Sequence, residues 1–395
     1  MADGDRDSDA PADGAVHGPL TGIRVVELAA IGPAPYGVML LSDLGAEVVR
    51  IDRASDVHHP EGASRTSIGM SRNRRSVAVD LKHDEGVAVV RRLAAEADVF
   101  VEGFRPGVAE RLGVGPDVLC SANPGLVYAR MTGWGQDGPL ADRAGHDIDY
   151  AALAGALQPV GRPDDTPPPP LNFLADFGGG GVFLALGVLA ALFERAGSGR
   201  GQIVDAAMVD GTASLTAFLH GLLADGAWTP RRGANLLDGA APFYDTYRCA
   251  DGRFVAVGAI EPQFYAALLD GLGLDAAEWP QHDRSRWPQQ KAELAEIFAT
   301  RSRDEWEEVF AGSDACVAPV LEPREAVDHP HNRERGVFVD VDGTTQPAPA
   351  PRLERTPGTV RRPAPAPGEH TDQVLAEFGY DAADLTRLRR GGAVA

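Results

Sequence analysis

The chain is organised around one stretch, which opens with GHDIDY at residues 145–150 and closes with NFLADFGGGG at residues 172–181. The first motif supplies an imidazole, His146, and the second supplies a carboxylate, Asp176. A histidine and a carboxylate that face one pocket can each take or give a proton. The sequence therefore predicts a two-base site in which His146 and Asp176 form the acid/base pair.

A run of four glycines, residues 178–181, separates Asp176 from a predicted helix over 182–196. An aspartate at this point can cap the helix N-terminus, where free amide N–H groups also stabilise an anion. Successive glycines are unfavourable in a helix, so a purely structural role explains them poorly. We expect a bulky ligand or another helix to approach the backbone closely here.

Outward from this stretch, apolar strands alternate with helices. We expect strands at 23–28, 47–51, 76–81, 98–104, 125–131 and 202–207, and helices at 36–44, 84–96, 107–113, 178–196 and 209–224. This alternation predicts an α/β fold with a parallel sheet and helices on its faces. The turn after the first strand has prolines between Gly32 and Gly37 in place of the G-x-G-x-x-G fingerprint, which argues against a bound dinucleotide.

A different pattern follows from residue 242. Residues 243–248 and 254–258 flank the turn Ala250-Asp251-Gly252, which predicts an antiparallel hairpin, and helices are expected near 262–272, 288–300 and 303–312. We therefore expect a large domain over 18–225, a linker over 226–241, a small α+β domain over 242–325 and a return segment over 326–395. The proline-rich part of that segment, 345–368, is predicted to be extended, and 372–390 to be helical.

Composition limits the class of protein. The formal net charge of −20 argues against binding to nucleic acid or to an anionic membrane. The apolar run over 182–193 is too short to span a bilayer and is interpreted as a buried helix. Residues 1–17 are acidic and lack an apolar segment, so we expect a disordered tail and no targeting signal. Three scattered cysteines indicate a cytoplasmic protein without a disulfide or metal framework.

Arginines at strand ends could bind a polyanion such as a nucleotide diphosphate. Arg53 and Arg105 each follow a predicted strand, and Arg111 comes shortly after. Arg72 and Arg74 precede another strand, and for these two a solvated face is the favoured interpretation.

Motifs along nearly the whole chain resemble the family III CoA-transferase superfamily and, within it, the α-methylacyl-CoA racemases. They are LGAEVVRID at 44–52, RNRR at 72–75 with DLK at 80–82, EGFRPG at 102–107, TGWGQ at 132–136, GHDI at 145–148, QIVD at 202–205 and GEHTD at 368–372. The resemblance implies a Rossmann-like large domain, a smaller α+β domain and an interlocked homodimer. It also implies an acyl-CoA thioester as substrate and no separate cofactor.

The resemblance assigns roles to particular residues. His146 and Asp176 match the two bases, and Glu261 matches a glutamate that orients the histidine across the dimer. The implied CoA contacts are Arg53, Val79, Asp80, Leu81, Lys82, Gly103, Phe104, Arg105, Arg111, Gly145, Asp147, Ile148, Asp149 and Tyr150.

The chemistry expected is removal of the proton next to a thioester by one base and its return on the opposite face by the other, with backbone N–H groups near Asp147 stabilising the enolate. The alternative is a CoA transferase of the same family, in which Asp176 is a nucleophile. A third class, a catalytically silent acyl-CoA-binding protein, has no use for His146, Asp176 and Glu261 together. Because only the racemase needs a second base, His146 favours the isomerase.

Overall fold

The computed structural model describes residues 18–58 and 69–395, so the predicted acidic tail lies outside the described residues. The chain forms two compact units. The first comprises residues up to Ala154, Leu171–Ser214 and Gly336–Ala395, and the second comprises Gly155–Pro170 and Leu215–Arg335. The expected linker at 226–241 and the expected small domain at 242–325 both fall within the second unit, which also takes in segments on either side of them.

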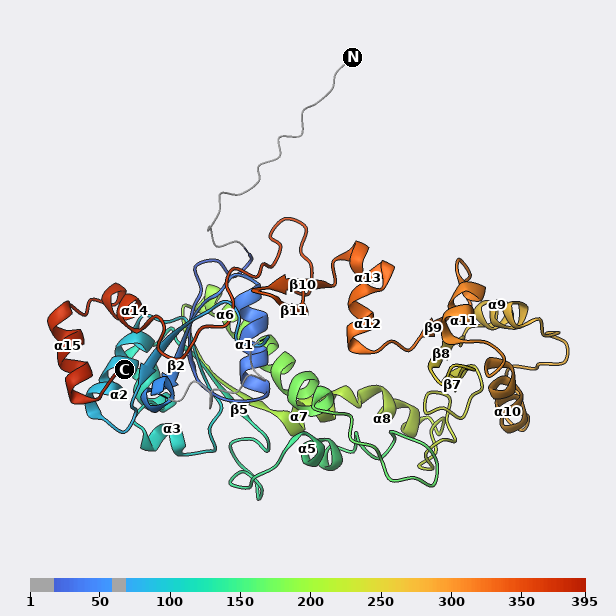
Figure 1. Ribbon diagram of the computed structural model, residues 1–395. Helices are drawn as coiled ribbons and strands as arrows, with labels where there is room; N and C mark the ends of the chain where they lie inside the picture. The colour runs from blue at the N-terminus through green and yellow to red at the C-terminus, as the bar shows by residue number, and fades with distance from the viewer. Residues whose placement is uncertain (1–17, 59–68) are drawn as a thin grey trace, which may run out of the picture. The chain divides into compact units, whose positions relative to one another are not determined.

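The first unit is built on a six-stranded parallel sheet (Figure 1). Its strands are β1 (Arg24–Leu28), β2 (Glu47–Arg53), β3 (Arg74–Val79), β4 (Val99–Glu102), β5 (Val127–Thr132) and β6 (Ile203–Ala207). They lie in the order β3-β2-β1-β4-β5-β6, which is the strand order of doubly wound nucleotide-binding folds. The predicted parallel α/β sheet is confirmed.

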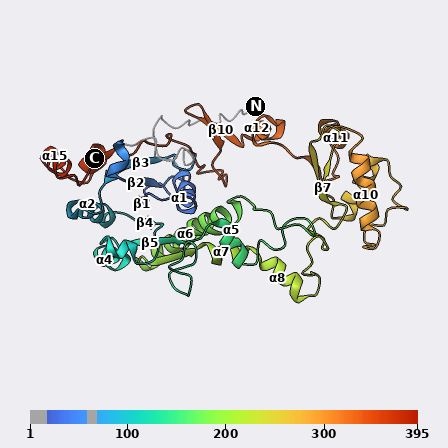
Figure 2. The same cartoon turned by 60° about the horizontal axis from the view of Figure 1, so that its bottom comes forward.

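Helices cover both faces of this sheet (Figure 2). One face packs against α1 (Pro33–Asp43) and α6 (Phe183–Ser198), and the other against α2 (Asp84–Ala95), α4 (Pro116–Ala122), α14 (Thr371–Glu377) and α15 (Ala382–Gly391). Among the described residues of the unit, the other helical segments are η1 (Ala54–His58), α3 (Val108–Arg111), α5 (Asp147–Leu153), the π-helix η3 (Phe173–Val182) and α7 (Met208–Leu215). A short hairpin, β10 (Phe338–Val341) with β11 (Thr344–Pro347), completes it.

Two helix starts differ from the expectation. Helix α1 begins at Pro33, within the segment expected to be a loop, because proline is tolerated in the first turn of a helix, where its missing N–H has no partner to lose. The helical stretch expected to start after the glycines begins at Phe173 as η3 and continues into α6. Asp176 therefore lies inside a helix, and the interpretation of Asp176 as an N-cap is wrong.

The combined stretch Phe173–Ser198 is long and apolar enough to cross a membrane by length and composition. Core helices of globular proteins pass the same test. Here α6 packs on β5 and β6 of the sheet with one face, as a core helix does. The helical stretch is longer than the predicted run over 182–193, and only 39% of its most apolar window is buried, so the interpretation of the run as a short buried helix holds for one face alone.

Arg72 and Arg74 are buried and paired, so neither the solvated-face nor the ligand interpretation holds for them. The Arg72 guanidinium donates to both Asp43 carboxylate oxygens, at 3.0 and 2.6 Å, and to the carbonyl of Pro347. Arg74 donates to Glu27 at 2.8 Å and to the carbonyl of Pro35 at 2.7 Å. The sequence shows that two arginines and two carboxylates are present, but only the fold places Asp43 beside Arg72 and Glu27 beside Arg74.

The C-terminal segment is fastened to the sheet by polar contacts. The Asn73 side chain donates to the carbonyl of Thr359 and accepts from the amide of Arg361, and the amide of Thr359 donates to the carbonyl of Asp43. Further on, Val394 forms a bridge with Val79 at the end of β3. Residues 336–395 thus complete the first unit after the chain has left it.

The second unit has its own sheet and an aromatic core. Strands β7 (Tyr244–Arg248), β8 (Phe254–Gly258) and β9 (Val317–Pro319) are antiparallel, which confirms the predicted hairpin and adds a third strand. The helices are α8 (Ala217–Ala224), α9 (Pro262–Leu272), α10 (Trp287–Phe298), α11 (Arg303–Phe310), α12 (Pro323–Asp328) and α13 (Pro330–Arg335). Phe243 packs edge-on against both Tyr265 and Trp287 in this core.

The buried pair Arg74–Glu27 predicts a large stability effect. Arg74→Met leaves the Glu27 carboxylate buried without its partner and should lower the free energy of unfolding by about 3–5 kcal/mol, measured by urea denaturation. As a control, Arg24→Met in β1 of the same sheet removes an exposed ion pair with Glu96 at the end of α2 and should cost about 1 kcal/mol or less. Equal effects of the two substitutions would contradict this account of the burial.

Candidate active site

A cavity of about 570 Å³ lies at the carboxyl ends of the parallel strands. The loops that follow β1 and β4 both contribute to it, and these neighbouring strands are the point where the strand order reverses. Ligands of open α/β sheets bind at this kind of position. The cavity is lined by Ile31, Gly32, Pro33, Ala34, Gly103, Phe104, Arg105, Pro106, Met131, Thr132, Gly133, Trp134, Ala141, Arg143, Ala144, Gly145, His146, Tyr150, Asn172, Asp176 and Met208.

His146 lies at the N-terminal end of α5, with its side chain exposed in the cavity. Its backbone N–H donates to the Asp149 carboxylate at 2.9 Å, and its carbonyl accepts from the amides of Asp149 and Tyr150. The first turn of α5 therefore holds the main chain of His146 from both sides. Exposure leaves the imidazole ring available to a ligand.

Asp176 lies in the fourth position of η3 and lines the same cavity as His146. Its Oδ2 atom faces Gly32, where an added Cβ would lie only 3.3 Å away. Burial, then the Asp147 charge, raises the pKa of Asp176 from 3.8 to about 6, while a hydrogen bond with Asn172 and the nearby His146 act in the opposite direction. The Asp176 carboxyl can therefore both hold and release a proton near neutral pH.

The glycine run brings η3 against neighbouring main chain. A Cβ at Gly179 would lie 2.3 Å from Thr212 Oγ1, and one at Gly181 would lie 2.8 Å from the carbonyl oxygen of Pro33. Helix α7 and helix α1 occupy these two sides, so the predicted close approach of another helix is found here. A π-helix is rare and often marks a functional site, because it moves side chains out of the regular α-helical pattern.

The cavity includes some of the predicted CoA contacts. Gly103, Phe104, Arg105, Gly145 and Tyr150 line it, together with the two predicted bases. Burial, then the charges of Asp176 and Asp149, raises the pKa of Tyr150 to about 12, so its hydroxyl stays protonated at neutral pH.

The other predicted contacts lie outside the lining. Exposed residues are Arg53 at the end of β2, Lys82 after β3, Arg111 in α3, and Ile148 and Asp149 in α5; Asp80 and Leu81 are half-buried after β3. The Val79 side chain is buried in the core, so only its main chain could meet a ligand. Asp147 is also buried and directs its carboxylate at η3.

Glu261 lies in the second unit, exposed at the N-cap of α9. It is not part of the cavity lining, which is made entirely of residues from the first unit.

Sequence reasoning missed three polar residues that line the cavity. Arg143 precedes His146 by three positions in the same loop. Asn172 precedes Asp176 by four positions, which is the spacing of neighbours on one helical face. The indole N–H of Trp134 is buried and has no hydrogen-bond partner among the described residues, and the ring packs edge-on against Tyr150. The spacing to His146 and Asp176 was the signal that could have found Arg143 and Asn172.

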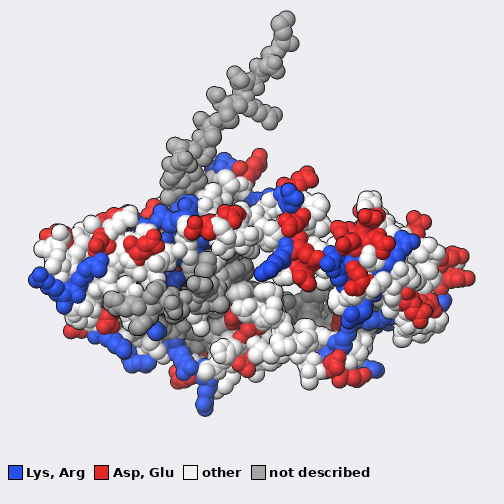
Figure 3. Space-filling view, viewed as in Figure 1, with Lys and Arg blue, Asp and Glu red and all other residues white. Residues whose placement is uncertain are grey.

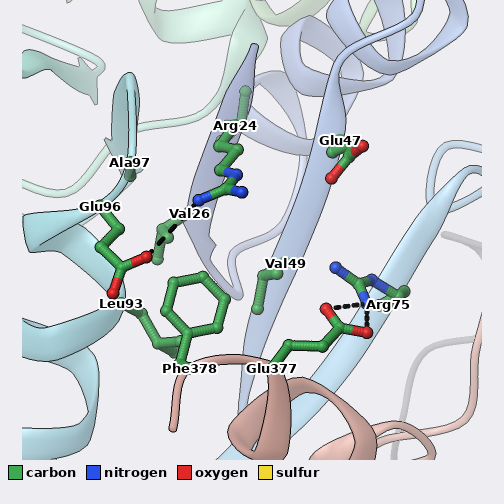
Figure 4. Close-up of a pocket in the computed structure, with 11 residues that line it drawn as sticks. Arg24, Val26, Glu47, Val49, Arg75, Leu93, Glu96, Ala97, Glu377 and Phe378 are labelled. Atoms are coloured by element: carbon green, nitrogen blue, oxygen red, sulfur yellow. Dashed lines mark hydrogen bonds and ion pairs between the residues drawn. The ribbon is translucent and has the colours of Figure 1, made fainter. Parts of the chain in front are cut away.

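A smaller cavity of about 90 Å³ lies between β1, β2 and the last turn of α14 (Figure 4). Four of its charged side chains form pairs, Arg24 with Glu96 and Arg75 with Glu377, and Glu47 also lines it. Cavities that hold a drug-sized ligand are several times larger.

The second unit has a cavity of about 730 Å³, where Arg162 is paired with Asp245. Position at the carboxyl edge of the parallel sheet, together with His146 and Asp176, and not size, makes the cavity of about 570 Å³ the candidate site.

On the face shown in Figure 3, basic and acidic side chains are interspersed. Among the described residues, no three His, Cys, Asp or Glu side chains are grouped so that they could hold a metal ion. The three cysteines Cys120, Cys249 and Cys316 are all free.

The model of CoA-transferase family III matches residues 20–371, and the chain belongs to this family. It is 50% identical over 372 residues to α-methylacyl-CoA racemase of Mus musculus, covering 93% of this chain and 96% of that protein. Identity to the Homo sapiens protein of the same name is 48% over 373 residues, with the same coverage. Similarity at this level supports an isomerase.

The fold agrees with a solved relative. A CAIB/BAIF family protein from Brucella suis is 27% identical, with a TM-score of 0.79 over 92% of this chain and 100% of that chain.

The raised pKa of Asp176 predicts a pH effect on stability. Folding strengthens proton binding at this carboxyl, so its stabilising contribution is complete below pH 3.8 and is lost as the pH rises through about 6. The free energy of unfolding of the native chain, minus that of Asp176→Asn, should therefore fall across this window in urea titrations. A difference that is flat or rises with pH would contradict the shifted pKa.

Proposed function

We propose that the protein interconverts the (2R) and (2S) forms of 2-methylacyl-CoA thioesters by moving the C2 proton. The observation that carries the proposal is that His146 and Asp176 line one cavity at the carboxyl ends of the sheet strands. The similarity to racemases over nearly the whole chain supports the same substrate class.

The two bases would act from opposite sides of the C2 carbon. With one enantiomer, a neutral His146 takes the C2 proton, and a protonated Asp176 returns a proton to the other face. This leaves a protonated His146 and an ionised Asp176, which is the starting state for the other enantiomer. The arrangement needs one partner protonated and the other not, and the pKa of Asp176 near 6 lies close to the ordinary value for histidine.

Charge that develops on the thioester oxygen needs preorganised donors. In α5 the amides of Asp149 and Tyr150 already donate to the carbonyl of His146, so the candidate donors are the earlier amides of this turn, at Asp147 and Ile148. Arg105 and Arg143 line the same cavity and supply positive charge for the phosphates of CoA. The exposed Arg53, Lys82 and Arg111 extend the basic groups along the strand ends.

The second candidate is a CoA transferase, which membership of the family keeps open. In that mechanism Asp176 attacks the thioester carbonyl and CoA leaves as a thiolate, which gives an anhydride between Asp176 and the acyl group. The thiolate then attacks the Asp176 carbonyl, so that the donor acid leaves as a carboxylate and Asp176 carries CoA as a thioester. The acceptor carboxylate attacks this thioester, and the released thiolate takes up the acceptor acyl group as the new acyl-CoA and frees Asp176. Asp176 serves both mechanisms, but an ionised nucleophile is favoured by a low pKa and its pKa is raised. His146 in the same cavity also favours proton transfer.

We propose that the active form is a cytoplasmic homodimer in which Glu261 of the partner subunit orients His146. Large apolar side chains of η3 and α6 are exposed on a single chain, among them Phe173 at 63%, Leu186 at 57% and Phe193 at 85%. Exposed apolar surface of this kind is typical of an interface. The helical stretch Phe173–Ser198 would then be covered by protein on both sides.

Incubation of one enantiomer of a 2-methylacyl-CoA in D₂O tests the proposed reaction. Without an acceptor acid, deuterium should enter C2 and both enantiomers should appear, followed by mass spectrometry and chiral chromatography. His146→Ala should reduce inversion by at least about 10²-fold, since it removes one of the two acid/bases, while CoA binding stays near the native level. Transfer of CoA to an added acid with the C2 proton retained would instead establish the transferase. Tight binding without either reaction would indicate a silent binding protein.

Sedimentation velocity tests the dimer. The native chain should sediment with twice the mass of one chain, and the double substitution Leu186→Glu with Phe193→Glu should shift it toward the single chain. Val118→Glu alters an exposed apolar residue of α4, on the opposite face of the sheet, and should leave the dimer intact. A native protein that sediments with the mass of a single chain would contradict the proposed interface.

A further inference from the structure

Asp147 stands next to His146 in sequence, yet its carboxylate is directed at the other base. The residue is only 6% exposed and does not line the cavity. Its Oδ2 atom accepts the backbone N–H groups of Ala175 and Asp176, both at 2.7 Å. One carboxylate oxygen therefore joins the first turn of α5 to the helix that carries Asp176.

These two amides need an external partner. Ala175 and Asp176 are the third and fourth residues of η3, and amides in the first turn of a helix have no carbonyl of their own helix to bond. The first main-chain bond of η3 is made by the amide of Phe177 to the carbonyl of Asn172. The Asn172 side chain makes no capping bond, so Asp147 acts as the cap of η3 from a different element.

An anion suits this position, because carboxylates bond strongly to amides at the positive end of a helix. The burial still has a cost, since Asp147 Oδ1 has no hydrogen-bond partner among the described residues. An asparagine could accept the same two bonds without a buried charge. A carboxylate here is therefore better explained by an effect of its charge than by capping alone.

The same turn of α5 also holds the other base. Asp149 accepts the backbone N–H of His146, whereas Asp147 accepts that of Asp176. The two carboxylates, two positions apart, thus tie the main chains of both predicted bases to one helical turn. Any displacement of α5 would move His146 and Asp176 together.

We propose that Asp147 is a positioning residue, whose carboxylate holds Asp176 in the cavity through two backbone hydrogen bonds and whose charge acts on the Asp176 carboxyl. This inference rests on the proposed proton transfer. The charge disfavours ionisation of Asp176, second only to burial among the effects that raise its pKa. Asp147 thereby keeps Asp176 able to donate a proton as well as accept one.

Other charged or titratable groups lie on the elements around η3, and the test must separate their effects from that of Asp147. Those on the elements packed against η3 and in the cavity lining are His146, Asp149 and Tyr150 of α5, Tyr36 and Asp43 of α1, Glu194 and Arg195 of α6, Asp205 of β6, Asp210 of α7, and Arg105 and Arg143. Asp43 is engaged by Arg72, Arg195 by Asp98, and Asp205 accepts from the amide of Gln136. Of these side chains, the interaction that opposes Asp147 is that of His146.

Two substitutions distinguish the charge from the bonds. Asp147→Asn keeps an oxygen acceptor and removes the charge. The part of the pH–rate profile of C2 proton exchange that follows the ionisation of Asp176, its pH limb, should therefore move to lower pH. The kcat value should stay within about tenfold of the native value. Asp147→Ala removes charge and bonds, and kcat should fall by about 10²-fold, as expected when a catalytic group is displaced by about 1 Å, with little change in KM. Asp381→Asn, which alters a similar aspartate cap at the start of α15, should change neither quantity.

An unshifted pH limb in Asp147→Asn, or a native kcat in Asp147→Ala, would overturn the proposal. If Asp147→Ala does not fold, the Asn variant still decides the question. The titration of Asp176 followed by carboxyl ¹³C NMR without substrate gives a second measurement, with Asp176→Asn to assign the resonance. A native protein that exchanges no C2 proton would refute the proposed function, whereas an Asp176 titration unchanged in Asp147→Asn would refute this inference alone.

Discussion

The contact of the glycine run with the helices around it is the constraint on which the site depends. Because Gly179 and Gly181 carry no side chain, η3 lies directly against α7 and α1, and each of these helices also brings a glycine, Gly211 and Gly37, to the contact. The main chain of η3 is thereby held in place, and Asp176 with it. At the start of η3, the Asp147 carboxylate accepts the amides of Ala175 and Asp176. Packing and hydrogen bonding thus locate the same carboxylate from two directions.

The sheet explains why the two bases meet. His146 and Asp176 are separated in sequence by a segment, Gly155–Pro170, that belongs to the second unit. The chain leaves the first unit after α5 and returns at Leu171, so that both ends of the excursion reach the carboxyl edge of one sheet. A parallel sheet opens its ligand site at this edge, and the reversal of strand order beside β1 and β4 creates the space.

Much of this could be predicted from the sequence. Alternating apolar strands and helices predicted the parallel sheet, and the motifs around His146 and Asp176 predicted two residues of one cavity. What failed depended on distant partners. Arg72 and Arg74 were interpreted as exposed because local sequence does not show that Asp43 and Glu27 lie opposite them. The start of η3 was missed because a π-helix, whose first amides are bonded by Asp147, leaves no local capping signal. The role of Glu261, which lies in the second unit, stays a prediction.

The distribution of label at early times tests the central claim, that two bases act on opposite faces of one carbon. One enantiomer of the 2-methylacyl-CoA is incubated in D₂O, and the two enantiomers are separated before a tenth of the substrate has reacted. The account predicts deuterium at C2 of the newly formed enantiomer and hydrogen at C2 of the recovered substrate, because the base that takes the proton is not the one that returns it. Equal labelling of both enantiomers from the start would mean that a single base serves both faces, and would contradict the assignment of His146 and Asp176 as a pair.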